Sequence, residues 1–402
     1  MKKAPSPIVS LIPIIVLVLL LFATIRTFGS DALSGGSQVS LLTTTAICIL
    51  IGMVFYKIPW KDYELAITNN IAGVATAIII LLIIGALSGI WVISGVVPTL
   101  IYYGMQIIHP SFFLASTCII CALISVMTGS SWTTIATIGI ALMGIGKAQG
   151  FEDGWIAGAI ISGAYFGDKI SPLSETTILA SSITDTPLFR HIRYMMITTV
   201  PSLVITLIIF TVAGFSHDAN NTQHIAEVAT ALNEKFHITP WLLIVPVATG
   251  ILIAKKVPSI VTLFLSTLLA AVFALIFQPD LLEEISGIAA SGFDSLFKGL
   301  MMTIYGETNL HTDNAVLTDL IATRGMSGMM NTIWLILCAM CFGGAMTASG
   351  MVGSITSIFV RFMKKTVSVV SATVCSGLFL NLTTADQYIS IILTGNMFRD
   401  IY

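Results

Sequence analysis

A short polar stretch at residues 167–177 separates two apolar segments and holds the side chains best suited to ion chemistry. Asp168 and Lys169 lie in it, far from any hydrophilic loop. A charge at the centre of a membrane helix costs about 2.5–3.5 kcal/mol on insertion scales, so such residues are retained mainly where they face a cavity. Small hard cations need several oxygen ligands. The stretch offers Asp168, Ser171, Ser174, Glu175, Thr176 and Thr177, and Pro172 frees a backbone carbonyl one turn earlier.

Structural roles compete with this interpretation. Asp168 and Lys169 carry opposite charges and could form a buried ion pair that only fixes the packing. Lys169 could instead contact an anionic substrate. Small hydroxyl residues are also favoured where membrane helices pack together. Packing accounts for any single hydroxyl of the stretch, but it does not account for the whole cluster.

Two further polar breaks interrupt apolar runs, at residues 129–134 and 381–386. Interrupted helices in corresponding positions are the best sequence indication of a transporter's binding site. Asp386 is the one carboxylate of the last break, and capping of a helix end is its alternative role. The residues that we expect to bind or support a cation from these breaks are Thr133, Thr134, Asn381, Thr384 and Asp386.

No signature of another chemistry accompanies these breaks. The sequence has no HExxH and no GxSxG, and Gly144–Lys147 lacks the upstream glycine and following hydroxyl of a phosphate-binding loop. All six cysteines lie in apolar stretches, where we interpret them as packing residues. The net charge of -2 gives no basic signature for nucleic acid. We therefore predict neither an enzyme, nor a cofactor, nor a nucleic-acid partner; a homodimer is left open.

The elements that position these residues are membrane helices. Of 402 residues, 56% are hydrophobic and 9% charged, whereas soluble domains carry about 25% charged residues. Lipid forces each segment to satisfy its own backbone hydrogen bonds, which favours helices. We predict an all-α polytopic protein of about nine to twelve segments, counting half-helices at 135–148 and 155–166. The continuous apolar segments cover 8–25, 39–56, 71–97, 111–128, 192–214, 240–254, 257–277, 331–348 and 366–380.

Basic residues predict the orientation. They recur at alternate ends of successive segments, at Lys2, Lys57, Arg190 and Lys255 among others. By the positive-inside rule the N-terminus is cytoplasmic, in the cell membrane, and the loop 215–238 lies outside. Residues 299–330 are too polar for a simple span and fit an interfacial or re-entrant segment.

A weak internal symmetry suggests inverted repeats. Ser94-Gly95 precedes Thr133-Thr134 much as Ser349-Gly350 precedes Thr383-Thr384. We therefore divide the chain into N-terminal helices, a first repeat, a middle part with two helices between external loops, and a second repeat. The corresponding ranges are 1–70, 71–214, 215–298 and 299–402.

The motif GDKISPLSETTILA at 167–180 resembles the NhaC family of Na⁺/H⁺ antiporters, whose hallmark is a GDK-SPLS-[DE]-TT segment. The stretches 128–146, 184–195 and 382–402 are similar to that family as well. The resemblance implies sodium/proton antiport, inverted repeats and a site around Asp168. Glu175 stands where aspartate is common, and Ile178 replaces a frequent asparagine. Family members usually continue beyond the equivalent of Tyr402, so we expect a truncated chain.

The leading hypothesis is Na⁺/H⁺ antiport by competition at one carboxylate. A carboxylate removed from water holds a proton more readily, so it can bind either a proton or a cation, and each excludes the other. A second hypothesis is exchange of small carboxylic acids such as malate and lactate, which the resemblance also allows, with Lys169 supplying the cation. A channel or a membrane sensor is the third.

Overall fold

A computed structural model describes residues 5–216, 222–308, 310, 312, 318, 321–355, 366–384 and 387–398. The described residues are helical, turn or irregular, and no strand occurs among them. Seven helices of this described part are long and apolar enough to cross a membrane, and a bent pair within 227–254 could form an eighth span. The predicted all-α polytopic fold is confirmed.

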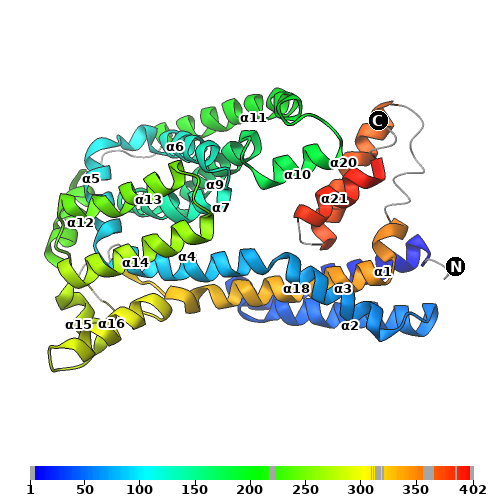
Figure 1. The fold of residues 1–402 in the computed structure, drawn as a ribbon, viewed down its shortest axis with the longest axis horizontal. Helices are drawn as coiled ribbons and strands as arrows, with labels where there is room; N and C mark the ends of the chain where they lie inside the picture. Colours follow the sequence, from blue (N-terminus) through cyan, green and yellow to red (C-terminus); the bar gives the residue numbers. More distant parts are fainter. Residues whose placement is uncertain are drawn as a thin grey trace. The chain divides into compact units, whose positions relative to one another are not determined.

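The helices form two compact units, which are described separately. Unit 1 contains residues 1–78, 179–186 and 330–402. It holds α1 (Pro7–Phe28), α2 (Gly36–Tyr56), α3 (Trp60–Gly73), α18 (Met330–Ala348), α20 (Thr366–Thr384) and α21 (Gln387–Phe398). Helix α18 packs against α2, α3 and α20, and α20 lies beside α21 (Figure 1). Leu41, Tyr63, Phe342 and Met346 are among its buried core residues.

Unit 2 contains residues 79–178 and 187–329 and carries the polar stretch. Helices α6 and α9 pack along each other, α11 covers both, and α15 and α16 form a hairpin (Figure 1). Its core is large and apolar, with Trp91, Phe113 and Ile156 fully buried. Its helices are α4 (Ala75–Ile93, mostly in this unit), α5 (Val96–Ile107), α6 (Phe113–Thr128), α7 (Ser131–Thr134), α8 (Ile140–Ala148), α9 (Asp153–Ile170), the start of α10 (Glu175–Ile183), α11 (Leu188–Ser216), α12 (Thr222–Lys235), α13 (Ile244–Ala254), α14 (Ser259–Phe277), α15 (Pro279–Ser286) and α16 (Phe293–Tyr305).

Two sequence expectations are wrong. The segment 215–238 is no simple loop, because α12 occupies Thr222–Lys235. Apolar residues are spaced among the polar ones of this segment. Three of them, Val228, Leu232 and Phe236, are buried in the core of unit 2. Helix α9 is also longer than the half-helix 155–166, running for 18 residues to Ile170.

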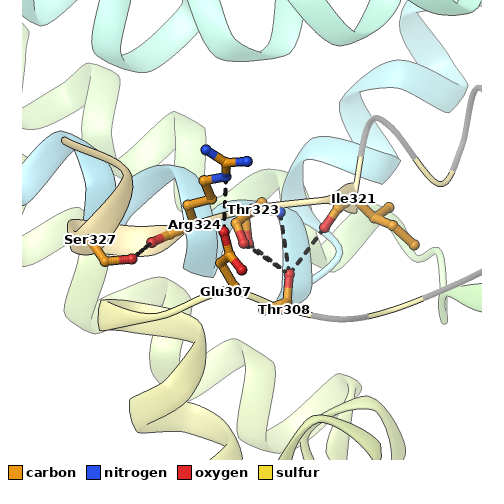
Figure 2. A network of polar contacts seen from close by, with 6 residues as sticks. All are labelled: Glu307, Thr308, Ile321, Thr323, Arg324 and Ser327. Atoms are coloured by element: carbon orange, nitrogen blue, oxygen red, sulfur yellow. Dashed lines mark hydrogen bonds and ion pairs between the residues drawn. The ribbon is translucent and has the colours of Figure 1, made fainter. Parts of the chain in front are cut away.

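After α16, residues 307–308 lie next to residues 323–324. The Thr308 amide donates to the Thr323 carbonyl at 2.9 Å, and the two threonine hydroxyls lie 3.0 Å apart. Beside them Arg324 Nε pairs with Glu307 Oε1 at 3.0 Å (Figure 2). Residues 307–308 and 323–324, which lie inside the predicted re-entrant stretch 299–330, are thus bonded to each other.

The two Ser-Gly pairs noted in the sequence have the same local geometry. In each, the serine hydroxyl donates to the carbonyl three residues earlier, from Ser94 to Trp91 and from Ser349 to Met346. Gly95 and Gly350 have φ of +84° and +70°, a left-handed conformation that suits glycine. Each pair ends one apolar helix and begins the next.

Candidate functional site

The candidate site lies where α9 ends beside the C-terminus of α6. These helices approach closely because Gly163 and Gly167 form a small-xxx-small pair on α9. A Cβ on Gly167 would meet the Ala122 carbonyl and lie 2.6 Å from the Ser125 Cβ. Glycine at these positions therefore lets the polar end of α9 lie directly against α6.

The first two polar breaks meet backbone to backbone. Helix α6 ends at Gly129, which has φ of +66°. A Cβ there would lie 2.7 Å from the Leu173 carbonyl carbon, so only glycine admits the turn after α9. The Ser171 hydroxyl donates to the Val126 carbonyl at 2.8 Å and adds a second link between the turns. The end of α6 and the turn 171–174 are therefore held in contact with each other.

Asp168 lies in the last turn of α9, partly buried, facing the start of α7. The Ser131 hydroxyl donates to Asp168 Oδ2 at 3.0 Å. The Ser174 side chain and the Ser131 N–H also interact with this carboxylate, and the charge of Glu175 acts on it. In the described part of the chain, Asp168 forms no ion pair with a basic side chain. The carboxylate is held by neutral donors, so no basic side chain of the described residues neutralises its charge.

The other hydroxyls of the 167–177 stretch build the turn or support Ser174. Thr177 Oγ1 donates to the Lys169 carbonyl at 3.0 Å, and the Thr176 and Ser174 hydroxyls lie 3.0 Å apart. Pro172 was expected to free the Asp168 carbonyl, but that carbonyl accepts the Ser171 amide at 3.2 Å. The tight turn after α9 supplies its own N–H donor to this carbonyl.

Thr133 and Thr134, expected as supporting residues, are buried and bonded within α7. The Thr133 hydroxyl donates to Ser130 Oγ at 3.1 Å. The Thr134 hydroxyl donates to the Ser130 carbonyl at 3.0 Å. These bonds close the first turn of α7, and Ser131 alone in this break is bonded to Asp168.

Lys169 does not form the expected ion pair with Asp168. Its side chain is exposed, and it takes part in no ion pair within the described residues. Adjacent helical residues project about 100° apart, so the two side chains leave α9 in different directions. Glu175 is exposed at the first position of α10.

A family model described as the Na⁺/H⁺ antiporter family matches residues 163–402, which include the whole 167–177 stretch. The chain is 35% identical to the Na⁺/H⁺ antiporter NhaC of Bacillus subtilis, over 90% of this chain and 77% of that protein. It is 36% identical to the malate-2H⁺/Na⁺-lactate antiporter of the same organism, over 91% and 75%. The chain belongs to the NhaC family of Na⁺/H⁺ antiporters.

The arginine/ornithine antiporter ArcD of Halobacterium salinarum is 30% identical over 100% of this chain and 79% of its own length. No solved structure matches the chain. This NhaC-family chain is thus a multi-pass membrane antiporter whose relatives carry different substrates.

The predicted break 381–386 in the second half of this NhaC-family chain is described only in part. Its residues 381–384 are helical and belong to α20, and α21 begins at Gln387, so the predicted interruption can lie at residues 385–386 alone, which are outside the described residues. Asp386 lies outside the described residues, as does the side chain of Thr384. Asn381 is described and exposed.

Sequence reasoning missed Ser131 as a site residue. The break 129–134 was recognised, but serine is common in membrane helices and its partner Asp168 is 37 residues away. The one available signal was its place directly after Gly129, which caps the end of α6, and Ser130, which caps the start of α7.

Proposed function

We propose that this chain exchanges Na⁺ for H⁺ across the cytoplasmic membrane, with Asp168 as the group that holds either ion in turn. The observation that carries the proposal is the carboxylate itself, bound only by hydroxyl and N–H donors among the described residues. A proton on Asp168 would remove the negative charge that attracts Na⁺, and bound Na⁺ would keep the proton away. Competition at one group is enough to couple the two fluxes.

Three further features support a sodium-type site. The Asp168 carboxylate and the Ser131 hydroxyl bonded to it are oxygen groups, which hard cations prefer. The names of two relatives contain Na⁺ and H⁺ as the exchanged ions. The matching Ser-Gly breaks at Gly95 and Gly350 fit two related halves of the chain. On this view residues 71–214 and 299–402 are the two repeats. Asp386 in the second repeat is then the counterpart of Asp168 in the first.

The orientation follows from the basic helix ends. Lys57 caps α2, Lys255 caps α13, and Arg190 lies in the first turn of α11. We place all three in the cytoplasm with the N-terminus. The mechanism needs no second copy of the chain, so a homodimer stays a prediction.

The test is flux in proteoliposomes that contain the purified chain. A Na⁺ gradient should drive proton movement of the opposite sense, without any organic acid. Asp168→Asn should abolish that proton movement, while the variant inserts into the membrane as well as the wild type does. Asp153→Asn is the matched control, because Asp153 begins the same helix and its side chain is 67% exposed. Equal flux from Asp168→Asn and wild type would refute the role of Asp168.

Exchange of an organic acid is the second candidate. Lys169 favours it, since its exposed ammonium is next to Asp168 in sequence and pairs with no described carboxylate. One relative exchanges malate and lactate by name. A strict requirement for malate or lactate in the flux assay would select this candidate over simple Na⁺/H⁺ exchange.

A further inference from the structure

The hydroxyls around Asp168 differ in what else they bind. Thr133 and Thr134 are bonded to Ser130 within α7. Ser171 is bonded to the Val126 carbonyl and Thr177 to the Lys169 carbonyl. Such bonds hold the backbone turns together, so we assign these four hydroxyls a structural role.

Ser131 donates a hydrogen bond to the carboxylate, and the Ser174 side chain interacts with it. Both are buried, with 3% and 0% of their surface exposed. They come from different breaks, Ser131 from the start of α7 and Ser174 from the turn after α9. The carboxylate of Asp168 therefore links two separate turns through these side chains.

A hydroxyl has one donor hydrogen and two acceptor lone pairs. Ser131 directs its hydrogen to Asp168 Oδ2 at 3.0 Å. When a cation approaches that oxygen, rotation about the C–O bond turns the hydrogen away and presents a lone pair instead. The serine needs no backbone movement for this exchange.

The two turns are also held at a fixed spacing. Gly129 and Leu173 touch through their backbones, and Ser171 ties the turn to α6. Rigid spacing between oxygen ligands is what lets a site discriminate between cations of different size.

From these observations we infer that Ser131 is a ligand of the transported cation, acting together with Ser174 and the carboxylate of Asp168. The inference rests on the proposed cation exchange and adds to it a residue that sets cation affinity. It also places three ligands of the cation within unit 2.

Equilibrium binding of ²²Na⁺ to the purified chain in detergent tests the inference without relying on transport. Ser131→Ala should weaken Na⁺ binding about tenfold or more, as expected for a lost contact to a charged group. Ser131→Thr keeps the hydroxyl and should restore most of the affinity. Thr137→Val is the matched control: Thr137 is buried in the same run of helix, and its hydroxyl donates to the Thr133 carbonyl at 2.8 Å.

The outcomes separate the two proposals. Wild-type affinity in Ser131→Ala would overturn the ligand role, even if the protein exchanges Na⁺ for H⁺. Weakened binding in Ser131→Ala and not in Thr137→Val supports the ligand role, even if flux assays reveal a different exchanged substrate. Should Ser131→Ala not fold, Ser131→Cys preserves the volume with a poor ligand for Na⁺, and the same tenfold loss is expected. Absence of Na⁺ binding to the wild type would refute both proposals.

Discussion

Gly129 and Leu173 are in backbone contact, and this contact joins the end of α6 to the turn after α9. A Cβ on Gly129 would lie 2.7 Å from the Leu173 carbonyl carbon and 2.8 Å from its oxygen. The two residues are far apart in sequence, yet their contact fixes the distance between Ser131 and the Asp168 carboxylate. The geometry of the candidate site therefore depends on glycine at position 129.

Replacing Gly129 with alanine should separate the two turns. The left-handed φ of +66° alone costs a non-glycine residue about 1–2 kcal/mol, and the clash with Leu173 adds to it. We expect a lower thermal unfolding midpoint and loss of transport. Gly154→Ala is the control, because a Cβ there meets nothing within 4 Å. Equal stability of the two variants would show that the contact is not required.

Gly163→Ala should weaken the packing of α9 on α6. A Cβ at this position would meet the Cys118 carbonyl and lie 2.9 Å from the Cys121 Cβ. We expect reduced thermal stability, measured by fluorescence of the purified protein on heating. Gly158→Ala lies on the same helix, where the nearest atom would be 3.8 Å away on Phe210, and it should behave like wild type. The account of α9 fails if Gly158→Ala is the more damaging change.

Helix α12 should be held by its apolar stripe more than by its ion pair. Leu232 is fully buried, and Leu232→Ala should cost about 2–5 kcal/mol. Lys235 pairs with Glu284 at 2.9 Å, but the Glu284 side chain is 48% exposed, so Lys235→Ala should cost under about 1 kcal/mol. Thermal unfolding of both variants tests the order. A larger loss in Lys235→Ala would contradict it.

Lys169→Ala should fold normally, contrary to the role of a buried ion-pair partner. Removing one partner of a buried pair typically costs about 3–5 kcal/mol, whereas Lys169 is exposed and unpaired among the described residues. We expect a change in stability within about 1 kcal/mol. Lys147→Ala, which breaks the 3.1 Å pair with Asp153, gives the scale for an exposed pair. A severe loss of expression in Lys169→Ala alone would restore the structural role.

The class of fold and the location of the candidate site could be predicted from the sequence. Both depend on the free-energy cost of placing polar groups in lipid. Apolar runs indicated α1, α2, α6, α11 and α14 closely, since lipid leaves few alternatives to a helix. Asp168 was recognisable because a charge between apolar segments is costly to insert. These features follow from local composition.

Features that depend on contacts between distant residues could not be predicted. Gly163 and Gly167 of α9 pack on α6, and no local pattern states which helix they face. The bond from Ser131 to Asp168 needs the fold of both turns. Helix α12 was missed because the buried residues Val228 and Leu232, and Phe236 directly after the helix, are spread among polar ones.

Proton release on Na⁺ binding tests most directly whether the two ions compete at Asp168. Na⁺ is titrated into purified protein in buffers of different ionisation enthalpy, and calorimetry then reports the protons released per Na⁺ bound. Below the pH at which the carboxylate loses its proton, wild type and Asp153→Asn should release a proton as Na⁺ binds. Asp168→Asn should show neither proton release nor comparable Na⁺ binding. Undiminished Na⁺ binding with proton release in Asp168→Asn would contradict the account.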